Sequence, residues 1–523
     1  MSTKSLERRR VDQADPTEAV EQLIAALGGR LAVIASAMET ITATGWRHHP
    51  GWGTDPGKPE AVAEFTYTVI DELSGSRYRL ALTGPTHLVP AELNYVEIGN
   101  GGAGHVTGSD FMFDPRPVDM TIPSWRVAAR VRHLDVTSPL RLAHKLLAPG
   151  ADLTLTTSTL DGTPTKVITL REVGRPATAI HLDPVSALPA RVCTVEEHSP
   201  LGDATVEVRF DAYGPAGRLT LPWQVTITVN GVPIHHETRS AIRVSPVVDA
   251  AQFEIDDKIT EPSEAQAAFS QYSTQWILAY VYSGVRFYFD LQTAPAESAP
   301  VDIAPGVKVV IGPSHNIMVV ELPDSVLAVE APLYDEYTRA ALVQVNEAFP
   351  GKPLSSVVAT HFHYDHIGGI REFAVDHGLR VYAGEPTVLF FQSIFTTPHT
   401  VDPDRYATHP SSVTVIGVKD KLSLPTADGG ELQMIRITSD HADDMMIVYL
   451  SSAKLVFESD LWNPTPAEPQ RGAQRGRLAT QVYDAIIELG LDVEWVVGGH
   501  LGTDGKTWTH IAPLRYLQIA ADR

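Results

Sequence analysis

Four metal-binding side chains fall within six positions of the segment Thr360-His361-Phe362-His363-Tyr364-Asp365-His366-Ile367-Gly368-Gly369. In an extended chain, residues two apart project to the same side, so His361 and His363 can bind one ion together. Asp365 and His366 follow where the chain turns, and they can face a second ion. Imidazole and carboxylate groups without a thiolate suit zinc, iron or manganese, and zinc is the commonest of the three.

Three further ligand candidates each follow a short apolar run that predicts a strand. His441 comes after residues 434–438, Asp460 after residues 454–457, and His500 after residues 495–497. Because loops that follow neighbouring strands can converge at one edge of a sheet, we expect these side chains to approach the 361–366 segment.

The surrounding sequence, residues 305–523, alternates strands and helices. Apolar runs predict strands at 307–311, 317–322 and 326–329, and residues 334–349 form a helix that ends at Pro350-Gly351. A buried strand at 356–359 leads directly into the histidine segment. This alternation indicates a layered sandwich of helices and sheets.

The chain before residue 305 has a different pattern. Residues 1–39 predict helices, the first of them capped by Asp15. Residues 40–250 alternate polar and apolar side chains and contain the hairpin signal Asn230-Gly231, which predicts an antiparallel β-rich domain. Residues 251–304 read as a helical connector, with a helix at 265–281, followed by a linker. The predicted fold class is therefore α+β with two domains. The β-rich region shows no group of residues that points to chemistry.

The ordered set His361, His363, Asp365, His366, His441, Asp460 and His500 resembles the seven-ligand set of the metallo-β-lactamase superfamily over residues 305–505. The resemblance implies a C-terminal αββα sandwich with the site at the edge between its sheets. Residues 329–333, 441–445 and 455–461 are also similar to a bacterial subgroup, in which a β-rich lipoprotein-carrier-like domain precedes the hydrolase.

The resemblance also implies a role for each ligand. His361, His363 and His441 would hold the first of two divalent metal ions, most simply Zn²⁺, and Asp365, His366 and His500 the second. Asp460 would bridge them. A bridging hydroxide would attack the substrate, and Asp365 would orient this nucleophile or pass a proton to the leaving group.

Other side chains near the motifs are candidates for supporting roles. Glu330, Asp443 and Asp444 are candidates for holding ligand imidazoles in the right tautomer. The candidates for lining a substrate pocket are Tyr364, His315, Asn316, Trp462 and Asn463.

The ligand types narrow the reaction within the superfamily. True β-lactamases generally lack the bridging aspartate, flavodiiron proteins carry Glu at position 363, and alkylsulfatases carry an acid at position 441. The relatives that remain are thioesterases, lactonases, phosphodiesterases and tRNA-processing nucleases. The net charge of −22 disfavours the nucleases, and we expect hydrolysis of a small ester, lactone or thioester. The alternatives are a phosphodiesterase, a mononuclear iron sulfur dioxygenase, and a binding module with a vestigial site.

Composition limits the partners. Asp and Glu total 63 against 41 Lys and Arg, and the formal net charge of −22 argues against nucleic-acid binding. One cysteine, Cys193, excludes an intrachain disulfide. The N-terminus lacks the apolar segment of a secretory signal, and no run is long enough to span a membrane. We expect a cytoplasmic, bacterial enzyme with a small-molecule substrate, and a homodimer stays open.

Overall fold

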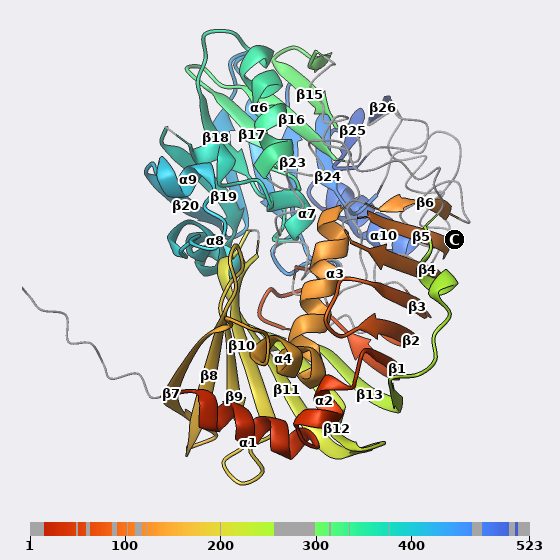
Figure 1. Ribbon diagram of the computed structural model, residues 1–523. Coiled ribbons are helices and arrows are strands. Elements are labelled where there is room, and N and C mark those ends of the chain that lie inside the picture. The colour runs from red at the N-terminus through yellow and green to blue at the C-terminus, as the bar shows by residue number, and fades with distance from the viewer. Residues whose placement is uncertain are drawn as a thin grey trace, which may run out of the picture. The chain divides into compact units, whose positions relative to one another are not determined.

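The computed structural model describes the following residues: 15–48, 51–58, 63–85, 92–101, 103–109, 118–122, 124–198, 200–255, 299–312, 315–333, 335–375, 377–462, 473–500 and 508–510. They divide into two compact units (Figure 1). The first unit takes the described residues of Met1–His48, Val62–Glu196 and Ala204–Arg286. The second takes those of His49–Ala61, Glu197–Asp203 and Phe287–Arg523. Two short stretches of the N-terminal half therefore belong to the second unit.

The first unit is built on a 13-stranded sheet with the order β6-β5-β4-β3-β2-β1-β13-β12-β11-β10-β9-β8-β7. Along the strands buried and exposed residues alternate, as expected where one face of a sheet is covered. The strands are β1 (Met38–Arg47), β2 (Ala63–Glu72), β3 (Tyr78–Pro85), β4 (Glu92–Asn100), β5 (Ala103–Ser109), β6 (Val118–Ile122), β7 (Asp152–Leu160), β8 (Thr163–Arg171), β9 (Thr178–Leu182), β10 (Pro189–His198), β11 (Gly202–Ala216), β12 (Leu219–Val229) and β13 (Val232–Val244).

Helices α1 (Thr17–Leu27), α2 (Arg30–Ile34), α3 (Ser124–Thr137) and α4 (Pro139–Leu146) pack against this sheet (Figure 1). In α1 the apolar residues recur at helical spacing, so Val20, Leu23, Ile24 and Leu27 share one core with strands β8–β13. The Asp15 carboxylate accepts the N–H of Thr17 at 2.9 Å, but Pro16 holds the N-cap position that the sequence assigned to Asp15, so the helix begins one residue later than predicted.

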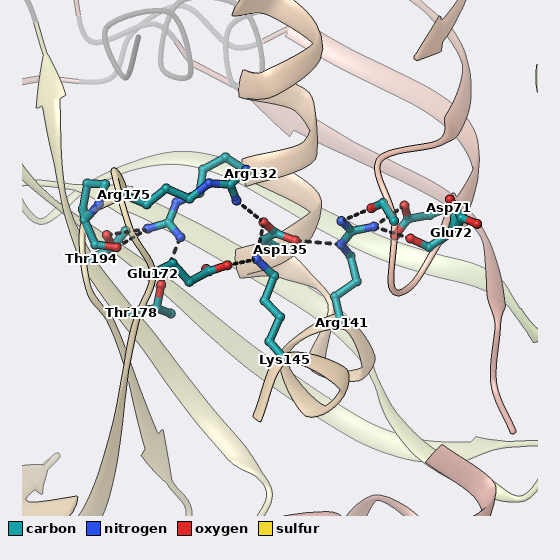
Figure 2. Close-up of polar contacts among 12 residues, drawn as sticks. Asp71, Glu72, Arg132, Asp135, Arg141, Lys145, Glu172, Arg175, Thr178 and Thr194 are labelled. Atoms are coloured by element: carbon teal, nitrogen blue, oxygen red, sulfur yellow. Dashed lines mark hydrogen bonds and ion pairs between the residues drawn. The ribbon is translucent and has the colours of Figure 1, made fainter. Parts of the chain in front are cut away.

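The first unit contains a cluster of buried ion pairs around helix α3 (Figure 2). Asp135 on α3 receives Arg141, Lys145 and Arg175, each at 2.8 Å. On the same helix, the Arg132 guanidinium lies 2.9 Å from Glu196 and also donates to the Thr178 and Thr194 hydroxyls. Each buried carboxylate here has a cationic partner, so the cluster satisfies its own charge.

The second unit contains a seven-stranded and a six-stranded sheet. The first comprises β14 (Val301–Ala304), β15 (Val307–Ile311), β16 (Asn316–Glu321), β17 (Val326–Val329), β18 (Leu354–Val358), β19 (Leu379–Gly384) and β20 (Val413–Val418). The second comprises β21 (Lys421–Pro425), β22 (Glu431–Arg436), β23 (Met446–Leu450), β24 (Leu455–Ser459), β25 (Trp495–Gly498) and β26 (Trp508–His510).

The cores of the second unit define its layers. Alternate residues of β16 and β17 point into two different cores: Ile317 and Val319 pack under α6 (Asp335–Ala348) and α8 (Val388–Thr396), whereas Met318 and Val320 face the other sheet. Helix α10 (Ala473–Glu488) covers the outer face of the second sheet. The order of layers is helix, sheet, sheet, helix. Burial on both faces explains why these strands are continuously apolar.

The two-domain α+β class is confirmed, with an antiparallel β unit first and an αββα sandwich second. The expected connector helix at 265–281 lies outside the described residues. Among the described helices, none has the length and apolar character needed to cross a membrane.

Candidate metal centre

The candidate ligands gather where strands of both sheets end. Strands β17 and β18 run parallel, as do β24 and β25, so the residues that follow them lie at one edge of the sandwich. The 361–366 segment follows β18 and enters the short helix α7 (Tyr364–Ile367), Asp460 follows β24, and His500 lies just after β25. His441 comes from the loop between β22 and β23.

The structure brings all seven predicted ligands together in two groups. One group consists of His361, His363, His441 and Asp460. The other consists of Asp365, His366, His500 and, in addition, His315. Within each group the ligand atoms all lie within 4.8 Å of one another. His315 was expected only in the pocket wall.

The spacing of these atoms fits coordination of an ion. Tetrahedral Zn²⁺ with bonds near 2.0–2.2 Å places its ligand atoms roughly 3.3–3.6 Å apart. His361 Nε2 and His441 Nε2 are 3.3 Å apart, and His441 Nε2 lies 3.2 Å from Asp460 Oδ2. In the second group, His366 Nε2 lies 3.6 Å from Asp365 Oδ2. These distances match the edges of a coordination polyhedron.

The Asp460 carboxylate divides between the two groups. Its Oδ2 faces the first, 3.2 Å from His441 and 3.8 Å from His361, while its Oδ1 faces the second, 3.0 Å from His366 and 2.8 Å from His500. By geometric criteria, neither Asp460 Oδ1 nor His366 Nε2 makes a hydrogen bond within the described residues, although both lie in close ion-pair contacts. Buried donors and acceptors are nearly always satisfied, so these atoms fit a pair of metal ions as the missing partner.

The other ring nitrogens of the ligand histidines are held by the protein. His366 Nδ1 lies 2.8 Å from Glu330 Oε2, His361 Nδ1 lies 3.0 Å from the Thr360 hydroxyl, and His363 Nε2 lies 2.8 Å from the carbonyl oxygen of Gly53. Such contacts fix which nitrogen carries the proton and turn the other toward the ion.

Glu330 is the central residue of this outer layer and is completely buried. It also accepts hydrogen bonds from the hydroxyls of Thr360, at 2.7 Å, and of Ser459. Its backbone has a φ of 74°, which a residue with a side chain rarely adopts, and its N–H donates to Val358 at 2.9 Å. Strain of this kind persists where the surrounding contacts over-determine the position, as they do here.

The electrostatics favour the metal-binding form of four of the candidate ligands. Burial alone would raise the pKa of Asp365 and of Asp460, but the neighbouring imidazoles outweigh it and hold both pKa values well below the usual range. Burial and neighbouring histidines lower the pKa of His361 well below normal, and burial and His441 lower that of His363 to about 3. Ionised carboxylates and neutral imidazoles are the forms that bind a metal. At His366 and His500 burial alone would lower the pKa, but the neighbouring carboxylates, Asp460 first among them, outweigh it and raise the pKa, so without a metal these two imidazoles hold a proton.

One part of the site was not anticipated from the sequence. In the second unit, residues 51–58 lie against the ligand loop: the Trp52 indole N–H is 3.4 Å from Asp365 Oδ1, and Gly53 holds His363. The Thr54 carbonyl accepts the N–H of Asp443 at 2.8 Å. A side chain at Gly51 would meet the ring of Tyr364, its Cβ 2.3 Å away, so only glycine fits. The available signal was a tryptophan within the glycine-rich stretch Pro50-Gly51-Trp52-Gly53.

Several expected supporting residues have other surroundings. Of the three carboxylates expected to orient imidazoles, Glu330 does so. Asp444 instead lies 2.7 Å from the Thr387 hydroxyl, and the Asp443 side chain is exposed. The Tyr364 ring packs with His198 and Phe390.

Two of the remaining pocket candidates make other contacts. Trp462 belongs to the core under α10. The Asn316 amide donates to the Gly498 carbonyl at 3.1 Å, which ties β16 to β25. Asn463 lies outside the described residues.

Residues 312–500 match the family model described as the metallo-β-lactamase superfamily. This part of the chain is therefore a domain of that superfamily. The match begins at residue 312, and the resemblance of residues 40–245 to lipoprotein carriers stays a prediction.

Solved structures align with less than half of the chain. A sec-alkylsulfatase from Pseudomonas sp. shares 17% identity over 44% of this chain and 42% of its own, with a TM-score of 0.31. A metallo-β-lactamase from Cronobacter sakazakii shares 15% identity over 44% of this chain and 95% of its own, with a TM-score of 0.31. A metallo-β-lactamase from Pontibacter korlensis shares 15% identity over 43% of this chain and 99% of its own, with a TM-score of 0.30. No curated protein matches the chain. The structural alignments carry no argument about activity.

Proposed function

We propose that the second unit is a dinuclear zinc hydrolase that cleaves a small ester, lactone or thioester. The observation that carries the proposal is the position of Asp460, whose two carboxylate oxygens face two different groups of histidines. A carboxylate placed in this way suits two cations better than one, because each oxygen has its own set of imidazole neighbours. Two bound divalent cations supply water ionised near neutral pH and a polarised substrate oxygen.

The chain's own residues hold the reacting groups in place. In this proposal His361, His363 and His441 would hold one ion, Asp365, His366 and His500 would hold the other, and Asp460 would contribute to both. Asp365 Oδ2 faces His366, while its Oδ1 accepts from the Trp52 indole, so the carboxylate cannot rotate freely. From this fixed position Asp365 orients the attacking water and takes up or gives a proton.

The site opens to solvent on the side of two of the ligands. The side chains of His441 and His500 are 18% and 27% exposed, whereas those of His361 and His366 are fully buried. We therefore propose that substrate approaches past His441 and His500.

The choice of a small carbonyl substrate rests on charge. A net charge of −22 opposes binding of polyanions such as nucleic acids, because that binding depends on lysine and arginine. A cytoplasmic location is part of the proposal, and the single cysteine is consistent with a reducing compartment.

Elemental analysis of the purified full chain, followed by ester, lactone, thioester and phosphodiester substrates, tests the proposal. We expect two zinc ions per chain and turnover of a carbonyl substrate that Asp365→Ala abolishes. Asp440→Ala is the matched control, since Asp440 is exposed, pairs with Arg477 and belongs to neither ligand group. If the protein cleaves only phosphodiesters, the proposed carbonyl substrate is wrong and the enzyme is a phosphodiesterase. One iron per chain with oxygen uptake on a persulfide would replace the hydrolase by a sulfur dioxygenase.

A further inference from the structure

We propose that His315 is a direct ligand of the second metal ion, which gives that ion one histidine more than the seven-residue set provides. The inference rests on the proposed metal centre and adds to it. Its basis is that His315 Nε2 lies together with the ligand atoms of Asp365, His366 and His500, all within 4.8 Å of one another. Four side chains from three separate segments thus converge on one point.

The distance from His315 to Asp365 matches the distance between two ligands of one ion. His315 Nε2 and Asp365 Oδ2 are 3.4 Å apart. Two ligands of one tetrahedral ion lie roughly 3.3–3.6 Å apart, and this separation is at the long end for an N–H···O hydrogen bond. The same oxygen lies 3.6 Å from His366 Nε2. Asp365 Oδ2 therefore stands at similar distances from both imidazoles, as it would if all three surrounded one ion.

The backbone holds His315 rigidly in this place. Its carbonyl oxygen accepts hydrogen bonds from the Tyr337 hydroxyl at 3.0 Å and from the N–H of Gly312 at 3.1 Å. His315 forms an isolated antiparallel bridge with His500, and the next residue, Asn316, donates its N–H to Gly499 at 2.8 Å. The His315 and His500 rings are 4.1 Å apart between centroids. These backbone contacts hold the two histidines in fixed positions relative to each other, as metal ligands require.

Cobalt substitution tests the proposal without using activity. Wild-type protein should bind two Co²⁺ ions. His315→Gln should lower the affinity for the second ion by at least roughly 100-fold, since removing even a group that supports a ligand typically lowers metal affinity 10- to 100-fold. The visible d–d spectrum of that ion should change, while the spectrum of the first ion stays the same. His399→Gln is the matched control, because His399 is a buried histidine of the same unit and belongs to neither ligand group.

A second variant gives a positive signal in case His315→Gln folds poorly. His315→Cys would place a thiolate at the ion and produce a thiolate-to-cobalt charge-transfer band. The background is low because the chain has one other cysteine, Cys193, which lies in the first unit. Two bound Co²⁺ ions in both variants with wild-type affinity and no charge-transfer band would overturn the ligand role alone. Wild-type protein that binds no Co²⁺ would overturn the proposed metal centre together with it.

Discussion

The two units each bury a cluster of charged groups, but they satisfy the charge differently. In the first unit, Asp135 faces arginine and lysine side chains (Figure 2), and Glu196 faces Arg132. In the second unit, Asp460 faces four imidazoles, and its ion-pair partners in the described chain include no arginine or lysine. A buried carboxylate that stays ionised needs a positively charged partner. The first cluster contains its own cations, whereas in the proposed metal centre the cations are metal ions. The first cluster therefore serves stability, and the second serves chemistry.

The largest expected effect comes from the carboxylate between the two histidine groups. Asp460→Ala should remove the bridge, lower metal content below two ions per chain, and reduce kcat/KM on the order of 10⁴-fold, since metal ions supply several kcal/mol of transition-state stabilisation. Metal content by elemental analysis and steady-state kinetics measure both. Two retained ions with near-normal turnover would contradict the contrast drawn between the clusters.

The matching change in the first unit should affect folding. Arg132→Met leaves Glu196 buried without its guanidinium, and breaking a buried pair in this way costs about 3–5 kcal/mol. We expect the free energy of unfolding of the first unit to fall by this amount, with metal content unchanged. The double variant Arg132→Met/Glu196→Gln should recover most of the loss. If the double variant is as unstable as the single one, the cost comes from packing and the ion pair is not its cause.

Glu330 links the strained end of β17 to the metal ligands, so its charge has a direct effect on binding. Glu330→Gln keeps the shape but weakens the contact with His366 Nδ1, and we expect metal affinity to fall 10- to 100-fold. Competition with a metal indicator measures the change. Thermal unfolding of the metal-free protein is the control, and a shift there as large as the shift in the metal-loaded protein would point to a purely structural role.

Asp444 should make stability depend on pH. Burial raises its pKa from 3.8 to about 7, so the folded state holds the proton more tightly than the unfolded state does. The stabilisation is complete below pH 4 and is lost as the pH rises through about 7, at roughly 1.4 kcal/mol per pH unit. Chelator-treated wild type should therefore become less stable from pH 5 to 7, and Asp444→Asn should show a flatter profile. The exposed Asp428→Asn is the control, and parallel profiles for wild type and Asp444→Asn would contradict the assignment.

The ligand loop could be predicted from the sequence because its chemistry is local. Four ligand residues within six positions, with His441, Asp460 and His500 after strands, allow few other readings. The apolar runs likewise predicted the sandwich layers. The surroundings of Asp444, the core position of Trp462 and the approach of residues 51–58 could not be predicted, because each depends on contacts between segments far apart in the chain. Hydrophobic periodicity predicts which side of a helix or strand is buried, but it does not predict which other segment of the chain packs against that side.

Trp52 tests whether that unanticipated segment contributes to the site. Trp52→Phe keeps an aromatic ring but removes the N–H that lies 3.4 Å from Asp365 Oδ1, and a single hydrogen bond contributes about 0.5–1.5 kcal/mol. We expect kcat to fall roughly 2- to 10-fold with KM nearly unchanged, because Asp365 would be less well fixed while the pocket keeps its shape. The pH profile of kcat should also shift, since the lost donor stabilises the ionised carboxylate. Unchanged kcat and pH profile would show that Trp52 only packs, and that the segment supports the ligands through backbone contacts such as that of Gly53 with His363.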